Sequence, residues 1–473
     1  MSPLLRRFAS PALIALLGLL LLGPGLRTPG HDAPAPGREA PASATLVNGP
    51  RTPPADPLAA AAAPAPVPVP PAPPARTGPP DVIVEGSGWG HSVGLSQYGA
   101  RAQAAAGWNH RQIISHYYPG VRMGRLRNSP PPIRVGLFTE RAVDATRVLL
   151  QAASRDGRAP SRAVTVDLGR GGVPIPHGQT WELRAEGPGM VLRDAAGVAR
   201  GQGPGPAIVQ FSFLRGRPTL LRLPQVGQAY QWGALEVHRI GATLQPVLVV
   251  PLELYLRGIA EVPSDWHHEA LRAQAVTART YALRTLQRGV QPGCWCHLGT
   301  TPLHQAYAGW AKEAGAHGHR WVAAVDATAN EVVTYQGKLA WTYFSSSHGG
   351  RTEHSEHSWA YPNAIPYLRS VDDRWSLRPE AGNPNARWRR AIPNAAFARA
   401  LGLGLREVRA VRILSRTPGG TPLELEVTGV NGRGELQVHR WRGARRGIAG
   451  ADLKLAFRAE LPSQQISQIT LAP

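Results

Sequence analysis

The stretch "GIAEVPSDWHHEALRAQAVTARTYAL", residues 258–283, decides how the middle of the chain folds. Its second half is rich in alanine. The residues that fall on one helical stripe are Leu271, Ala275, Ala278, Ala282 and Leu286. We expect a helix that starts after Pro263, at Ser264 or Asp265. Because the stripe carries small side chains, this helix is predicted to pack closely in the centre of its domain.

A strand and a shorter helix precede this helix. The segment "PVLVV" (246–250) is apolar and rich in β-branched residues, which favours a buried strand. Pro251 then suits the first turn of a helix. The apolar residues of that helix at helical spacing are Leu252, Tyr255, Leu256 and Ile259. Together with strands predicted on both sides, these helices indicate an α+β fold.

Glu261 lies between the two predicted helices. The C-terminal end of the first helix raises the pKa of a nearby carboxyl group, and the N-terminal end of the second lowers it, each by up to about one unit. A general acid near neutral pH needs the raised pKa, so burial beside apolar groups such as Trp266 has to decide the outcome. On this basis Glu261 is the candidate catalytic residue.

The other polar residues of the stretch have structural explanations. Glu269 falls in the first turns of the long helix, where an acidic side chain matches the helix dipole. His267 and His268 suggest a metal-binding pair, but the zinc-protease pattern H-E-x-x-H requires a histidine where Arg272 stands. We interpret both histidines as polar residues at the start of the helix.

The two cysteines form a candidate metal site. Cys294 and Cys296 are separated by one residue, too close for an easy disulfide, so no disulfide framework is expected. With His304 nearby, two thiolates and an imidazole suit Zn²⁺, although C-x-C is not the usual C-x-x-C spacing. A reduced pair of thiols without metal is the open alternative.

A glycine-rich segment, "GSGWGHSVGLSQYGA" (86–100), has the composition of a site loop. It lacks the G-K-[ST] of a phosphate-binding loop, and the side chains that it presents to a ligand are His91 and Gln97. Trp89 and Tyr98 suit either stacking on a sugar or packing in the core.

A second polar segment, "SSSHGGRTEHSEHSW" (345–359), lacks the G-x-S-x-G pattern of serine hydrolases, so we expect a turn that lines a site. Residues 129–245 contain short strand patterns separated by Gly/Pro turns and are predicted to be a β-rich insertion with no evident chemistry. Residues 376–473 are expected to form a C-terminal α+β segment.

The N-terminus predicts export. Arg6 and Arg7 precede the apolar run "ALIALLGLLLL" (12–22), which is shorter than the about 20 residues of a membrane span. Residues 1–28 are therefore expected to be a signal peptide or an uncleaved signal anchor, which would be the chain's only membrane contact. Residues 29–80, rich in Pro and Ala, are expected to be an extended linker.

Net charge is weak evidence about partners. The 52 basic and 31 acidic residues give +21, which suits an anionic polymer or surface. However, all the basic residues except Lys312, Lys338 and Lys454 are arginine, a bias that Ala/Gly/Pro/Arg-rich chains share. The export signal disfavours nucleic acid as the partner.

Four blocks of the chain resemble the SpoIID/LytB family, the sporulation stage II protein D domain. The blocks are "VPLELYLRGIAEVPSDWHHEALRAQAVTARTYAL", "TPLHQAYAGW", "YFSSSHGGRTE" and "GWGHSVGLSQYGARAQAAAG". The last block precedes the core here, which implies a permuted order around one site. The resemblance implies a SpoIID-like mixed domain made of residues 81–128 and a catalytic core at 246–375, with a central Ala-rich helix.

The resemblance also implies a function in the bacterial cell envelope. It implies a lytic transglycosylase that cuts the glycan strands of peptidoglycan, or a non-catalytic enhancer of a cell-wall amidase. Glu261 occupies the position of the family's catalytic acid. The substrate-binding residues that the matching blocks imply are His91, Gln97, Tyr98, Gln305, Tyr307, Ser346, Ser347, Gly349, Gly350 and Thr352.

Two positions depart from the family pattern, and one feature fits lytic chemistry. His348 replaces a serine, and His304 replaces a cysteine that binds zinc in some members.

A glycosidase that uses water or a covalent intermediate needs two carboxyl groups. A transglycosylase needs one, since the 6-hydroxyl of muramic acid attacks its own anomeric carbon and Glu261 acts as acid and base. No cofactor is required for that reaction.

Overall fold

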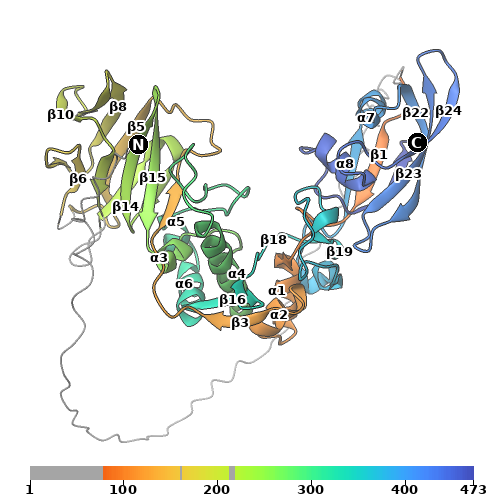
Figure 1. Cartoon of the computed structure of the whole chain (residues 1–473), viewed down its shortest axis with the longest axis horizontal. Helices are drawn as coiled ribbons and strands as arrows, with labels where there is room; N and C mark the ends of the chain where they lie inside the picture. Colours follow the sequence, from red (N-terminus) through yellow and green to blue (C-terminus); the bar gives the residue numbers. More distant parts are fainter. Residues whose placement is uncertain (1–77, 160–161, 212–218) are drawn as a thin grey trace, which may run out of the picture. The chain divides into compact units, whose positions relative to one another are not determined.

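The structure is a computed structural model that describes residues 78–159, 162–211 and 219–473, all in one compact unit, Ala75–Pro473. The predicted signal segment, 1–28, and all but the end of the predicted linker lie outside the described residues. The described part contains both helices and many strands, which confirms the α+β prediction (Figure 1). No helix in these ranges is long and apolar enough to cross a membrane.

Two six-stranded sheets form the β-rich part of the chain (Figure 1). In spatial order the first consists of β10 (Ala199–Gly203), β9 (Gly189–Arg193), β8 (Thr180–Glu186), β5 (Arg147–Ser154), β12 (Thr219–Leu223) and β13 (Gln228–Tyr230). The second consists of β4 (Ile133–Gly136), β15 (Thr243–Val250), β14 (Ala234–Ile240), β11 (Ala207–Gln210), β6 (Val164–Asp167) and β7 (Gly172–Ile175). Strand β15 contacts β5 and β8 across the two sheets. The predicted strand 246–250 is therefore the end of β15 and belongs to the same sheet as the insertion.

Helix α3 (Leu252–Arg257) follows β15, with Pro251 as its N-cap. Helix α4 (His268–Leu286) is the predicted Ala-rich helix, and it contacts α1 (Gln97–Ala105), α2 (His110–Tyr117) and α6 (Gly318–Ala327). Its small residues Ala275, Ala278 and Ala282 are fully buried. The helix lies at the centre of the core, as its stripe of small side chains predicts.

The predicted start of α4 was wrong by three to four residues, because the helix begins at His268 with His267 as N-cap. The backbone before it is held in another way. The Lys312 ammonium donates to the Val262 carbonyl at 2.6 Å, and the Arg320 guanidinium donates to the Trp266 carbonyl at 3.0 Å. These carbonyl groups accept from side chains of α5 (Trp310–Ala314) and α6 and not from a helical turn of α4.

Short strands connect the helices. A small sheet consists of β17 (Lys338–Leu339), β16 (Glu331–Tyr335) and β3 (Arg122–Arg125). Two-stranded pairs are formed by β2 (Leu95–Ser96) with β18 (Phe344–Ser345), and by β19 (Gly350–Arg351) with β20 (Asp372–Asp373). The single-turn 3-10 helices are η1 (Pro224–Val226), η2 (Ser355–His357), η3 (Arg374–Leu377) and η4 (Pro379–Ala381).

The C-terminal segment contains helix α7 (Asn394–Leu401) and a three-stranded sheet of β22 (Leu405–Arg416), β23 (Pro422–Asn431) and β24 (Leu436–Trp441). Helix α8 (Ala449–Ala456) contacts β23. A further sheet pairs β1 (Val82–Gly86) with both β21 (Trp388–Ile392) and β25 (Ile466–Leu471). The first described strand is thus the central strand of a sheet whose edges come from the C-terminal segment, and its Val82 and Val84 lie in that segment's core.

Candidate active site

Glu261 follows α3, in a turn that pairs with a distant segment. Residues 258–260 run antiparallel to residues 306–308, with hydrogen bonds from the Ala260 amide to the Ala306 carbonyl, 2.8 Å, and from the Ala308 amide to the Gly258 carbonyl, 2.9 Å. The Ala306 amide then donates to Oε1 of Glu261 at 2.6 Å. A Cβ at Gly258 would lie 2.4 Å from the ring of Tyr307, so only glycine permits this close approach.

The pKa of the Glu261 carboxyl group is raised to about 7, and burial is the main cause. The hydrogen bonds from the Ala306 amide and from the Gln97 side chain act in the opposite direction, because they stabilise the carboxylate. Burial therefore decides the outcome, as a general acid at this position requires. At neutral pH a large share of Glu261 carries the proton.

Glu261 lines a cavity of about 530 Å³. The aromatic residues of its wall are Trp89, Tyr281, Tyr343, Phe344, Trp359 and Tyr361. The polar side chains that share the cavity with Glu261 include His91, Gln97, Glu140, Thr301, His304, Ser345 and Ser346. Aromatic walls with a few polar groups are typical of a ligand site, and stacked aromatic faces suit a sugar.

The glycine-rich segment (86–100) pairs with the serine-rich segment (345–359) at this cavity. Strand β2 pairs in parallel with β18, Trp89 bridges to Ser347, and the Tyr98 amide donates to the Ser346 carbonyl at 3.0 Å. A Cβ at Gly94, where φ is +73°, would lie 2.0 Å from the Tyr343 carbonyl oxygen. Glycine is needed at this position because the backbones of the two segments are in contact there.

His91 is a neutral member of the cavity wall. Its Nδ1 accepts from the Val93 amide at 3.1 Å, and its ring packs edge-on against Tyr361 with a centroid distance of 5.1 Å. Burial lowers the pKa of His91 to about 4, so it is uncharged at physiological pH.

The cavity brings together five of the predicted site residues: Glu261, His91, Gln97, Ser346 and His304, the last of which was predicted as a metal ligand. The other predicted binding residues do not line it. Tyr98 packs on Trp266, with ring centroids 5.1 Å apart. Gln305 accepts from the Tyr255 hydroxyl at 3.0 Å and is fully buried. Tyr307 stacks on Tyr255 at 5.0 Å, so these residues support α3 and the segment that binds Glu261.

The remaining predicted residues hold the serine-rich segment in place. Ser347 is fully buried and bridges to Trp89. Gly349 accepts at its carbonyl from the Ser87 hydroxyl, 3.0 Å, and Gly350 pairs with Asp373 in β19 and β20. The Thr352 hydroxyl donates to the Arg369 carbonyl at 2.9 Å. His348, which stands in place of the family's serine, lies 3.0 Å from the Ser345 hydroxyl through Nε2.

The predicted Cys/Cys/His metal site is corrected by the structure. Cys294 and Cys296 form a disulfide, so neither sulfur is a thiolate ligand. The prediction held that the Cα atoms of two cysteines separated by one residue lie too close for an easy disulfide. A turn with Trp295 at φ +54° brings them to 5.1 Å, within the range of disulfides. Nδ1 of His304 instead lies 3.0 Å from Oε1 of Glu140.

Other expectations about polar residues are confirmed. His267 accepts from the Glu269 amide at 3.3 Å as N-cap of α4, and His268 is the first residue of that helix. Glu269 binds the His110 amide at 2.6 Å and the Arg272 guanidinium at 2.5 Å. Burial raises the pKa of Glu269, but these hydrogen bonds lower it by more, so the net pKa is lowered.

Glu140 is the main site residue that sequence reasoning missed. It lies between β4 and β5, within the insertion for which no chemistry was predicted, and its φ is +63°. Its carboxylate accepts from the Thr301 hydroxyl and faces His304. The sequence around Glu140 contains no motif, so only the fold places this carboxyl group in the cavity with Glu261.

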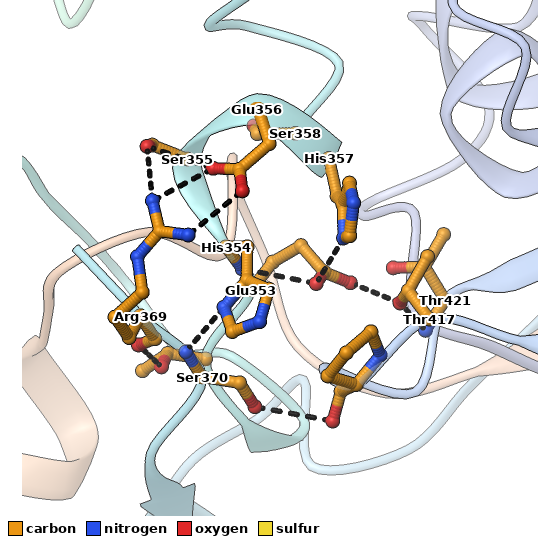
Figure 2. A network of polar contacts seen from close by, with 12 residues as sticks. Glu353, His354, Ser355, Glu356, His357, Ser358, Arg369, Ser370, Thr417 and Thr421 are labelled. Carbon is orange, nitrogen blue, oxygen red and sulfur yellow. Dashed lines mark hydrogen bonds and ion pairs between the residues drawn. The ribbon is translucent and has the colours of Figure 1, made fainter. Parts of the chain in front are cut away.

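The loop of residues 353–361, which includes the end of the serine-rich segment (345–359), carries Trp359 and Tyr361 into the cavity wall. Figure 2 shows its polar contacts: Glu353 accepts from the Thr417 hydroxyl at 2.5 Å, and Glu356 forms a paired ion contact with Arg369. Glu353 is fully buried, yet its hydrogen bonds lower its pKa. The C-terminal segment thus supports one wall of the site.

Comparison with known proteins agrees with this arrangement. Residues 241–335, which include Glu261, the Ala-rich helix and Tyr307, match the model of the SpoIID family, stage II sporulation protein. Residues 241–335 of the chain therefore match the SpoIID family, in line with the resemblance of its motifs to the SpoIID/LytB family.

Individual relatives match smaller or larger parts of the chain. Stage II sporulation protein D of Bacillus amyloliquefaciens is 30% identical over 182 residues, which are 36% of this chain and 51% of the relative. The protein of the same name from Bacillus subtilis (strain 168) is 30% identical over 187 residues, 37% of this chain and 53% of the relative. The amidase enhancer of the same bacterium is 34% identical over 120 residues, 25% of this chain and 15% of the relative. The chain thus spans about half the length of the two sporulation proteins.

Proposed function

We propose that the chain is a cell-wall enzyme, a lytic transglycosylase that cleaves the glycan strands of peptidoglycan. The observation that carries the proposal is the carboxyl group of Glu261, which lines an aromatic-walled cavity and whose pKa is raised by burial to about 7. The SpoIID family match and the relative named amidase enhancer support a role at the cell wall. The predicted signal at 1–28 would export the chain to the envelope.

In the proposed reaction, Glu261 does the work of both acid and base. The protonated carboxyl group donates its proton to the glycosidic oxygen, and the bond between that oxygen and the anomeric carbon of muramic acid breaks. The 6-hydroxyl oxygen of the same sugar bonds to the anomeric carbon, and the Glu261 carboxylate accepts the hydroxyl proton. The products are a free 4-hydroxyl on one sugar and a 1,6-anhydro end on the other, and no water is consumed.

The test is the structure of the products. Purified peptidoglycan, both intact and stripped of stem peptides, is digested with the full chain, and the fragments are analysed by mass spectrometry. We expect anhydromuramic ends, with at least about 100-fold less product from Glu261→Gln, because the amide has no proton to donate. Glu269→Gln is the matched control, since that carboxylate lies outside the cavity and should leave the product pattern unchanged.

Glu140 favours a second candidate reaction, hydrolysis. It lines the cavity with Glu261 and lies 3.0 Å from His304, so the pair has the groups needed to activate a water molecule. Ordinary reducing ends that vanish in Glu140→Gln would identify this reaction and contradict the transglycosylase proposal.

Enhancement of a cell-wall amidase is the non-catalytic alternative, and the similarity to an amidase enhancer favours it. In that case the pure chain releases no fragments from either form of peptidoglycan. Glu261→Gln would then stimulate a partner amidase as well as the wild type does.

A further inference from the structure

We propose that a second cavity, next to the one that contains Glu261, is a subsite for a carboxylate carried by the glycan; this inference rests on the proposed function. The second cavity measures about 390 Å³. It shares five wall residues with the first, namely Tyr281, Leu303, His304, Tyr343 and Tyr361. A polymer that occupies the first cavity therefore lies directly beside the second.

The two cavities differ in charge. The first is lined by the carboxyl groups of Glu261 and Glu140. The second is lined by Arg288, and none of the described residues in its wall is Asp or Glu. An anionic substituent of the substrate would be repelled by the Glu140 carboxylate, and by Glu261 where it is ionised, and attracted to the guanidinium in the second cavity.

Arg288 belongs to a pair of like charges without an acidic partner. Arg284 lies in the last turn of α4 and Arg288 lies two residues beyond its end, and their guanidinium carbons lie 5.2 Å and 4.6 Å from the centroid of the Trp341 ring. Over the described residues, neither of them forms an ion pair at 4.0 Å or less. Of the two, Arg288 lines the second cavity and presents its positive charge there.

A neutral donor lies in the same wall. Nδ1 of His297 accepts from the Arg134 amide at 3.0 Å, and burial lowers the His297 pKa. The neutral ring therefore carries its hydrogen on Nε2, the nitrogen that remains for the cavity. Arg288 and this N–H share the cavity wall with Trp341 and Tyr343 and form a set suited to a carboxylate.

The proposed substrate carries such a group next to the bond that is cleaved. The lactyl ether of muramic acid ends in a carboxyl group, which is either free or joined to a stem peptide with carboxylates of its own. The guanidinium recognises the same chemistry in both. The structural alternative is that Arg288 only complements the negative C-terminal end of α4.

The experiment measures binding of small sugars to the full chain by titration calorimetry. The probes are N-acetylmuramic acid, its methyl ester, muramyl dipeptide and N-acetylglucosamine. The variants are Arg288→Ala, Arg288→Lys and, as matched control, Arg378→Ala, because Arg378 also stacks on a tryptophan, Trp375 at 3.9 Å, but lines neither cavity. Thermal unfolding of each variant is recorded beside the titrations.

We expect one carboxylate-bearing probe to bind about tenfold or more tightly than the ester, with the preference lost in Arg288→Ala, partly kept in Arg288→Lys and intact in Arg378→Ala. Preference for the free acid identifies the lactyl carboxylate, and preference for the dipeptide identifies the peptide. Equal binding of acid, dipeptide and ester, or a fall in Tm of Arg288→Ala without a change in selectivity, would overturn the subsite.

The outcome is separable from that of the proposed function. If selectivity is absent while anhydro ends still form from peptidoglycan, the subsite is wrong and the transglycosylase stands. If the carboxylate preference depends on Arg288 while no glycan is cleaved, the chain binds the wall polymer without cutting it.

Discussion

At the scale of single residues, the burial of Glu261 has a consequence for pH. A carboxyl group whose pKa rises on folding binds its proton more tightly in the folded chain. The free energy of unfolding therefore falls as the pH rises from the unfolded value of 4.5 through about 7, by at most about 3 kcal/mol. Glutamine at this position keeps an acceptor for the Ala306 amide and does not titrate.

We therefore predict that Glu261→Gln is more stable than the wild type at pH 8 and gains nothing at pH 4. Urea unfolding at the two pH values measures the difference. In the same range, cleavage by the wild type should decline above pH 7, because the fraction of protonated Glu261 falls. A stability difference that does not change with pH would contradict the assignment.

Glu269 should behave in the opposite way. Its pKa is lowered by hydrogen bonds from the His110 amide and ring and from Arg272, so its contribution to stability is present above the unfolded pKa and is lost as the pH falls below it. We predict that Glu269→Ala lowers the free energy of unfolding by about 1–3 kcal/mol at pH 7, and less at pH 3. Cleavage by the folded variant should stay near the wild-type rate, as expected of a structural residue.

At the scale of elements, the turn that presents Glu261 depends on Lys312. Burial lowers the pKa of the Lys312 ammonium to about 8, and the group donates to the Val262 carbonyl next to Glu261. We predict that Lys312→Met lowers kcat several-fold, because the turn loses the contact that holds it outside the helix. Lys338→Met is the matched control, since Lys338 is an exposed residue of β17. Equal kcat values for Lys312→Met and Lys338→Met would show that the Lys312 contact with the turn does not affect catalysis.

Some helices and site residues could be predicted from local sequence patterns, and others could not. Periodicity predicted α3 and α4, because burial on one face of a helix leaves a local pattern. The start of α4 was missed because Lys312 and Arg320, about fifty residues away, supply its alternative partners. Glu261, His91, Gln97 and Ser346 were found through motifs. Glu140 and the disulfide were not, because each depends on a backbone turn at positive φ that no local pattern encodes.

At the scale of the whole molecule, the C-terminal segment supports the cavity wall. Arg446 donates through Nη2 to the Glu356 carbonyl at 3.1 Å and the Ser358 carbonyl at 2.7 Å, and also to the Tyr361 carbonyl. One guanidinium therefore fixes the loop that carries Trp359 and Tyr361, as the contacts around Glu356 in Figure 2 also do.

We predict that Arg446→Ala raises KM for peptidoglycan about tenfold with a smaller change in kcat, because the loop shapes the binding wall and not the acid. Arg445→Ala is the matched control, since the Arg445 side chain is exposed and only its backbone amide binds Asp452, at 2.8 Å. A loss of kcat without a change in KM would assign the loop to the chemistry instead.

The pairing of β1 with β25 joins residues near position 82 to residues near position 471. During synthesis the first described strand has no partner on one edge until almost the whole described chain has been made, and closing so long a loop is slow. The residues that follow β1 include His91 and Gln97, two side chains of the cavity. In a nascent or truncated chain without β25, the strand that leads into these cavity residues therefore keeps one edge unpaired.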